Sequence, residues 1–152
     1  PIDETTLEPL VYKTYLESIR RQGIDVFRAR GELAKAGREM GRFFQRYDLL
    51  ISPTSGRIDQ RLGTLNGTAS PEISASEWAR RRRDYACITP LANVVGLPSI
   101  SLPLCMSAAG HPIGIEIDGG IDQDERVLQL SAQLERAMPW HGRKPQIYVA
   151  DL

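Results

Sequence analysis

Several features are scarce in this 152-residue sequence, and each scarcity excludes a class of protein. Two cysteines, Cys87 and Cys105, are too few for a disulfide-stapled scaffold. No apolar run approaches the roughly 18–20 residues that a membrane-spanning helix needs. Neither sign of charge is in excess, because 19 Lys and Arg balance 19 Asp and Glu. The chain therefore has no basic stripe of the kind that would neutralise a nucleic-acid backbone.

The N-terminus lacks two common signals. Its first residues, Pro1-Ile2-Asp3-Glu4, have neither the basic nor the apolar region of a secretory signal peptide, which favours a cytoplasmic location. An initiator methionine is also absent, so we expect residue 1 to lie inside a longer polypeptide. In the cytoplasm the two cysteines are predicted to be reduced and buried, and a disulfide between them stays an open alternative.

What is present, 41% hydrophobic and 25% charged residues, is typical of a globular protein. Apolar periodicity and turn residues predict an α/β chain, with all of 1–152 belonging to one domain. The expected segments are a helical pair (1–47), a strand (48–54), a long loop (55–76), helices (77–96), a strand pair (99–118), a helix (122–138) and a tail (139–152). We expect this tail to be loosely attached.

Capping residues predict where the helices begin and end. Gly23 is expected to end the first helix in a left-handed conformation, and Asp25 to cap the second. Ser74-x-x-Glu77 is a capping-box pattern, and Thr89-Pro90 repeats a helix-start signal. The second helix is predicted to have one apolar face, formed by Leu33, Ala36, Met40, Phe43, Phe44 and Tyr47.

The strands point to a sheet that is incomplete. The continuous apolar run 48–54 is typical of a strand buried on both faces. In 113–118, isoleucines alternate with Gly114, Glu116 and Asp118, which predicts one apolar face and one face that is partly wet. Pro103 predicts a sheet edge or a bulge. Three strands cannot cover so many helices, so we expect the sheet to be completed by strands from elsewhere.

No catalytic or metal site follows from residue spacing alone. The order Cys87, Cys105, His111, His141 contains no close ligand pair, so no zinc site is predicted, and His111 is expected to be an exposed turn residue. The serines lie in no nucleophile elbow, and no base can be assigned to any of them. Arg80–Arg83 would fan around a helix, with Glu77 and Asp84 in pairing reach, so nucleic acid is a disfavoured partner.

One stretch carries a resemblance. Residues 85–103, with Thr89, Asn93, Gly96 and Pro98, followed by 110–117, closely resemble the C-terminal part of amidase-signature enzymes, whose pattern is T-x-x-x-N-x-x-G-x-P-x-[IL]-S-[VLI]-P and then G-x-P-[IV]-G. Residues 42–54 are similar to that family's D-x-L-L-x-P-T strand and the helix before it. The lead-in at 7–9 and the Pro139-Trp140 pair are similar as well, so five motifs match in order over nearly the whole chain.

This resemblance implies a fold and a chemistry. The family fold is a large mixed β-sheet covered by helices on both faces, in a chain roughly three times longer than this domain-sized one. The family hydrolyses or transfers amides without a cofactor, through a Ser–cis-Ser–Lys triad and an acyl-enzyme. None of the triad carries over, because this chain has no Gly/Ser-rich signature run, and Lys13, Lys35 and Lys144 fall in segments that match regions downstream of the catalytic lysine.

The resemblance leaves this chain one part of the substrate pocket. Strand ends and the loops after them are where α/β sheets bind ligands, so we predict pocket-lining roles at Pro53, Thr54, Ile88 and Thr89, and at Asn93. Purely structural roles are the alternative for two of them. Thr89 would be a helix N-cap, and Asn93 a satisfied packing hydrogen bond.

The leading hypothesis is the C-terminal part of an amidase-signature hydrolase that cleaves a carboxylic amide, with its triad in an N-terminal part upstream or on a separate chain. The segment alone would be inactive. Its partners would be that N-terminal part and a small-molecule amide, with no membrane, and with a homo-oligomer left open. The alternatives are an amidotransferase subunit that generates ammonia, and a non-catalytic binding or scaffold module of the same fold.

Overall fold

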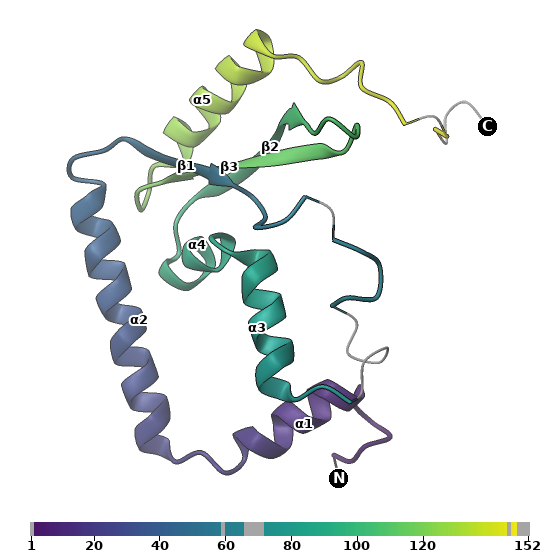
Figure 1. Cartoon of the computed structure of the whole chain (residues 1–152). Helices are drawn as coiled ribbons and strands as arrows, with labels where there is room; N and C mark the ends of the chain where they lie inside the picture. Colours follow the sequence, from purple (N-terminus) through teal and green to yellow (C-terminus); the bar gives the residue numbers. More distant parts are fainter. Residues whose placement is uncertain (1, 59, 66–71, 146, 149–152) are drawn as a thin grey trace.

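The computed structural model describes residues 2–58, 60–65, 72–145 and 147–148. Within them the chain alternates helices and strands, as the α/β prediction required (Figure 1). The elements are α1 (Pro9–Ser18), α2 (Gly23–Phe43), β1 (Leu49–Pro53), α3 (Ala75–Ala86), α4 (Thr89–Val95), β2 (Ser99–Met106), β3 (Pro112–Gly119) and α5 (Asp124–Ala137).

The three described strands form one antiparallel sheet in the order β1-β3-β2. Strand β3 is central, with Leu49 paired to Gly119 on one side and Ser99 paired to Asp118 on the other. The register of β2 shifts between Leu102 and Cys105. Pro103 lies at that shift on an edge strand, because a residue without an N–H cannot continue the ladder, and its predicted position is therefore confirmed.

The two faces of the sheet differ in chemistry. Figure 1 shows α5 on one side of the sheet and α4 on the other. The face toward α5 is apolar: Ile117 is fully buried, and Gly119 lies so close to Val127 that an added Cβ would approach Val127 Cγ2 to 2.7 Å. Burial of these aliphatic groups supplies the hydrophobic stabilisation of the sheet.

The opposite face of β3 is polar but not wet, which corrects the prediction from the alternating pattern. Glu116 is 3% exposed and Asp118 is fully buried. Their neighbour Ser52, paired with Glu116 in the register, is buried too. Period-two alternation separates the two faces of a strand, but it does not say whether the polar face meets water or another layer of protein.

Strand β1 differs from its prediction in the opposite direction. Ser52 is buried, but Ile51, on the face shared with Ile117, is 58% exposed. Helix α5 packs against β2 and β3. The apolar run was predicted to be buried on both faces, and in this structure the outer edge of the sheet at β1 leaves that burial incomplete.

The helix boundaries confirm some capping predictions and correct others. Ser74 is the N-cap of α3, where its hydroxyl accepts the Glu77 N–H at 3.1 Å. Gly96 ends α4 in the left-handed region, with φ of +80°. Gly23, in contrast, is the first residue of α2, and Asp25 accepts the Gln22 N–H in a capping box instead of being the cap. A Gly two residues before an Asp suits a helix start as well as a helix end.

Two further expectations are wrong. Cys87 and Cys105 are both exposed, although they are unpaired thiols as expected. The start of the tail is tied to the sheet where it was expected to be loose, because an Arg143 guanidinium N–H donates to the Pro103 carbonyl at 2.6 Å, whereas 146 and 149–152 lie outside the described residues. Pro103, at the β-bulge, thus leaves a carbonyl that a side chain from outside the sheet can reach.

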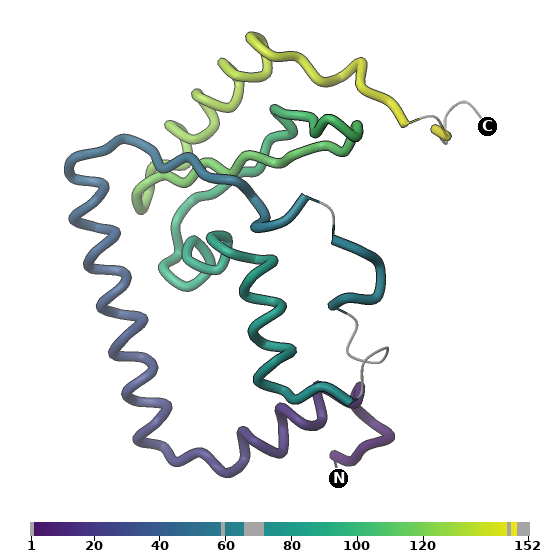
Figure 2. The backbone as a smooth tube through the Cα atoms, in the orientation of Figure 1, coloured from purple at the N-terminus to yellow at the C-terminus, as the bar shows by residue number. Residues whose placement is uncertain are grey.

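Helix α2 is the least covered element. None of its residues is buried, and Leu33, on the predicted apolar face, is 48% exposed. Figure 2 shows α2 leading from the sheet to α1 at the opposite end of the molecule. Amphipathic helices in proteins owe most of their stability to packing of the apolar face. No helix within the described part is long and apolar enough to cross a membrane.

Candidate functional site

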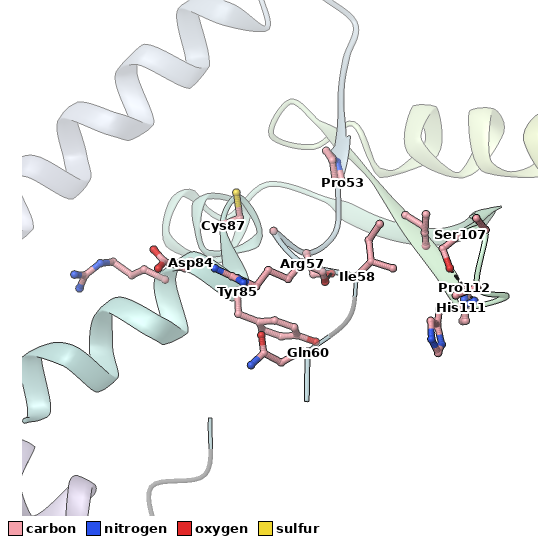
Figure 3. Close-up of a pocket in the computed structure, with 16 residues that line it drawn as sticks. Pro53, Arg57, Ile58, Gln60, Asp84, Tyr85, Cys87, Ser107, His111 and Pro112 are labelled. Carbon is pink, nitrogen blue, oxygen red and sulfur yellow. Dashed lines mark hydrogen bonds between the residues drawn. The ribbon is translucent and has the colours of Figure 1, made fainter. Parts of the chain in front are cut away.

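A cavity of about 1400 Å³ opens where β1 ends. Three segments line it: the residues after β1, the junction between α3 and α4, and the turn between β2 and β3 (Figure 3). Antiparallel pairing explains their meeting, since Pro53 is the register partner of Ile115, and this places the start of β3 beside the end of β1. The three segments are far apart in sequence, so the cavity exists only in the folded chain.

The loop after β1 is held against α3 by a close backbone contact at Gly56. The Gly56 N–H donates to the Tyr85 carbonyl at 2.8 Å. A Cβ at Gly56 would lie 2.2 Å from the Asp84 carbonyl oxygen and 3.2 Å from the Cys87 Cβ. Glycine is required here because the two backbones approach too closely for any side chain.

Cys87, next to Gly56 in the cavity lining, has an unusual backbone conformation. It follows the last residue of α3 with φ of 50° and ψ of −81°, and its N–H donates to the Arg83 carbonyl at 2.7 Å. A positive φ in a residue other than glycine costs on the order of 1–3 kcal/mol, and such residues cluster at functional sites. The exposed thiol lines the cavity beside Asp84 and Tyr85.

The turn between β2 and β3 supplies a histidine and a serine. His111 is exposed, as predicted from its Gly-His-Pro setting, and it is one of the residues that line the cavity. Its backbone N–H donates to Ser107 Oγ at 3.0 Å, the bond drawn in Figure 3. Because the peptide N–H makes this bond, and not the imidazole, the pair is a turn constraint rather than an activated serine.

The predicted pocket residues are placed in three ways. Pro53 lines the cavity. Thr54 lies next to lining residues but directs its hydroxyl to Ser101 Oγ at 2.5 Å, and its N–H to the Gly114 carbonyl at 2.9 Å. Asn93 is exposed on α4 and is not among the described residues that line this cavity.

Ile88 and Thr89 directly follow Cys87. Ile88, not Thr89, precedes α4 as its N-cap, so the expected Thr89 cap is displaced by one residue. The Thr89 hydroxyl donates to the Ala86 carbonyl at 2.8 Å. That bond satisfies a carbonyl that α3 leaves free at its C-terminus. Thr89 thus joins two helices beside the cavity, and no side-chain hydrogen bond of Asn93 occurs within the described residues.

Several cavity residues were missed by the sequence prediction. Arg57, Asp84, Tyr85 and Cys87 line the cavity together with Pro53. The sequence signal for Arg57 was its position in a long non-periodic loop, because binding residues are often found in such loops. The other three line the cavity because α3 ends beside β1, and no local sequence pattern predicts that contact.

The described residues do not assemble a catalytic triad. Ser55, in the cavity wall, donates its hydroxyl to the Arg57 carbonyl at 3.0 Å. Lys13 donates to the Ile73 carbonyl, and Lys144 lies over the Tyr148 ring. In the described ranges no group of three or more His, Cys, Asp or Glu could hold a metal ion. The cavity is lined by backbone and side-chain groups that could orient a ligand.

Comparison with known proteins decides the family. A family model described as Amidase matches residues 13–128. The chain belongs to the amidase family. The resemblance of residues 85–103 and 110–117 to amidase-signature enzymes is thereby confirmed.

Relatives of this amidase-family chain have several names. It is 36% identical over 108 residues to a "Putative amidase AmiC" of Mycobacterium leprae, covering 71% of this chain and 22% of the relative. It is 34% identical over 108 residues to a protein of a Synechococcus strain that is named as a glutamyl-tRNA(Gln) amidotransferase subunit. That match covers 70% of this chain and 18% of the relative. The chain thus spans about a fifth of the length of these curated relatives.

A solved structure is similar over almost the whole chain. The structure of 6-aminohexanoate cyclic dimer hydrolase superposes with a TM-score of 0.79 and 29% identity, over 96% of this chain and 31% of that one. The α/β arrangement with its three-stranded sheet is therefore the amidase-signature fold, as the sequence predicted.

Proposed function

We propose that this chain is the C-terminal part of a hydrolase that cleaves a carboxylic amide through an acyl-enzyme, with its Ser–cis-Ser–Lys triad in an N-terminal part outside residues 1–152. Membership of the amidase family and similarity to proteins named as amidases support amide hydrolysis.

The observation that carries this proposal is the exposed surface of the chain. Its accessible area is 11277 Å² for 16.9 kDa. A compact monomer of that mass exposes about 7,700 Å², so this chain exposes roughly 3,600 Å² more. If a partner surface of equal area covered all of it, the interface would bury roughly 7,200 Å² in total, which is in the size class of the largest obligate interfaces. We infer that the N-terminal part of the same enzyme covers it, on the same polypeptide or a separate chain.

In this proposal the cavity at the end of β1 is one wall of the substrate pocket. Pro53 and the loop after it line this wall together with the end of α3 and Cys87, and Ile88 and Thr89 follow Cys87 directly in the chain. The N-terminal part would bring the nucleophile, its Lys base and the oxyanion donors to the open side. The role of this chain is then to position and enclose the amide, since orientation and exclusion of water lower the barrier.

The test is an amide-hydrolysis assay on the intact source protein. We expect release of amine from simple anilides, and loss of that release after treatment with a serine-reactive fluorophosphonate. Residues 1–152 expressed alone should release none. Hydrolysis by residues 1–152 alone would contradict the proposal, and so would an intact protein that cleaves no amide in a panel of acyl lengths.

Two other functions are separable from amide hydrolysis by simple measurements. Similarity to a protein named as part of an amidotransferase makes an ammonia-generating subunit the second candidate. A stoichiometric partner protein, and dependence on a second substrate, would identify it. A non-catalytic scaffold of the same fold would show binding without amide cleavage even in the full polypeptide.

A further inference from the structure

A second cavity adjoins the candidate site along α3. Its volume is about 350 Å³, and it shares Arg57, Gln60 and Asp84 with the larger cavity. That volume is at the lower end of the range for small-ligand sites. Because lining residues are shared, a molecule in the larger cavity could extend one end into the smaller one.

Two hydrogen bonds fix the loop that forms one wall of this cavity. The Gly56 N–H donates to the Tyr85 carbonyl at 2.8 Å, and the indole N–H of Trp78 donates to the Leu65 carbonyl at 3.1 Å. Between these anchors, the Thr64 hydroxyl donates to the Arg61 carbonyl at 2.8 Å. The loop is therefore tied to α3 near both ends of that helix, which holds the loop side chains over it.

Arginines dominate the lining, and they differ in how they are paired. Arg80 contacts Glu77 at 2.9 Å and Asp84 at 2.7 Å, and Arg81 contacts Glu77 at 2.8 Å. These bonds hold the pKa of Glu77 down to about 2, first through Arg80 and then through Arg81. The two carboxylates thus balance the two α3 arginines.

Arg57 and Arg61, on the facing loop, differ from Arg80 and Arg81 in their charge pairing. Within the described residues neither forms an ion pair, and Asp84 is the one acidic residue in the described lining. A guanidinium presents paired N–H donors that match the two oxygens of a carboxylate. Within the described lining, this cavity of about 350 Å³ therefore has four arginines and one aspartate, and the two loop arginines form no ion pair with the described residues.

We propose that Arg57 and Arg61 form a carboxylate-binding subsite, so that the amide substrate carries a free carboxylate at some distance from the bond that is cleaved. This inference rests on the proposed amide hydrolysis. A phosphate backbone fits less well, because Arg82 lies over the Trp78 ring at 4.8 Å and Arg83 lines the larger cavity. The arginines of α3 thus point to different surroundings and do not form a continuous row.

The test compares two anilides of equal size on the full-length enzyme. Glutaric acid monoanilide ends in a carboxylate, whereas 5-methylhexanoic acid anilide ends in two methyl groups in its place. We expect wild type to have the higher kcat/KM for the acid. Hydrogen bonds to a charged group are strong enough that R57Q/R61Q should lower kcat/KM for the acid about tenfold more than kcat/KM for the neutral anilide.

Arg136 provides a matched control, since it is exposed in the last turn of α5. R136Q should leave both anilides unchanged. Added salt should reduce the preference of wild type for the acid, because exposed charges are screened. An equal loss for both anilides in R57Q/R61Q, or no loss for either, would overturn the subsite.

A direct titration separates failure of the subsite from failure of the proposed function. If wild type cleaves neither anilide, binding of glutaric acid monoanilide is measured by calorimetry. If wild type binds this acid and R57Q/R61Q binds it about tenfold more weakly, the carboxylate subsite is supported and the proposed hydrolysis is contradicted. No binding by wild type, an unchanged affinity in the variant, or salt-sensitive binding of an RNA oligonucleotide in its place, overturns the subsite.

Discussion

At the scale of single residues, Gly56 is the position where the site depends most directly on one side chain being absent. An added Cβ would lie 2.2 Å from a main-chain oxygen, Asp84 O, so the backbone of the loop or of α3 has to move. We expect Gly56→Ala to destabilise the full-length protein by about 1–3 kcal/mol, the usual cost of overpacking, and to lower amide-cleavage activity.

Gly31→Ala is the control for this change. A Cβ at Gly31 meets nothing within 4 Å, and the residue lies inside α2. Alanine there should stabilise the helix by roughly 0.5–1 kcal/mol. Thermal unfolding of both variants distinguishes the two effects, and a Gly56→Ala protein as stable as wild type would show that the close contact at Asp84 is absent.

Glu116 predicts a dependence of stability on pH. Burial, and then the negative charge of Asp118, raise the pKa of the Glu116 carboxyl above its ordinary value of 4.5. A raised pKa in the folded state means that the stabilising contribution is complete below pH 4.5 and is lost as pH rises through the folded pKa. The side chain of Glu116→Gln cannot ionise, so the free energy of unfolding of this variant should fall less than that of wild type as the pH rises.

Urea unfolding midpoints of the full-length protein, measured from pH 4 upward, provide the measurement. Glu135→Gln on the exposed part of α5 is the control and should follow the wild-type curve. Identical pH dependence in wild type and Glu116→Gln would show that Glu116 is ionised at no cost in the folded protein.

Residue-scale prediction from sequence succeeded where the signal is local. Ser74 caps α3 because its hydroxyl needs only the N–H three residues ahead. The burial of Glu116 and the role of Gly56 were not predictable, because each depends on a segment distant in sequence. Thr89 was predicted to cap a helix or line the pocket. Its bond to the Ala86 carbonyl was not predicted, because the capping pattern describes one helix and this bond joins two.

At the scale of elements, α2 is a helix whose apolar face is only partly covered by the described residues. Leu33 is 48% exposed, and Met40 and Phe44 are half-buried. If the N-terminal part of the enzyme packs on this face, Leu33→Ser should destabilise the full-length protein by about 1.5–3 kcal/mol, the value of a fully buried leucine side chain.

Lys35→Ser is the matched control, since Lys35 is exposed two residues away on the same helix. It should change the free energy of unfolding by less than about 0.5 kcal/mol. Chemical unfolding of the two variants provides the comparison. Equal, small effects would mean that α2 faces water in the intact protein and would remove one of the surfaces assigned to the N-terminal part.

The positions of helices and strands were predictable where the local sequence pattern determines the conformation. The structure has strands over 99–106 and 112–119, and a helix over 124–137, where alternation and amphipathic spacing indicated them. Burial was less predictable than conformation. An apolar run such as 49–53 is compatible with burial on both faces, but Ile51 has no layer over it in this structure.

At the scale of the whole molecule, the chain has more surface than a self-contained domain of its mass. The excess of roughly 3,600 Å² predicts that residues 1–152 alone expose hydrophobic patches large enough to bind a dye such as ANS and to self-associate. The full-length protein should do neither. Dye fluorescence and sedimentation of the two provide the measurement, and a monomeric, dye-free chain 1–152 would contradict the predicted missing cover.

The missing strands are a prediction from sequence alone, because counting strands against helices needs no coordinates. The order of strands could not be inferred in that way. β3 lies between β1 and β2, and this pairing brings the turn at His111 to the end of β1. Register between distant strands is set by the whole sheet, and for that reason the cavity was predicted at Pro53 but its facing wall was not.

The central claim is that this chain forms one wall of an amidase whose nucleophile lies outside it. Labelling the intact source protein with a fluorophosphonate, followed by peptide mapping, locates the reactive serine directly. The account predicts a single adduct on a serine N-terminal to residue 1 or on a separate chain, and none on Ser52, Ser55, Ser99 or Ser101. An adduct on any serine within 1–152 would contradict it.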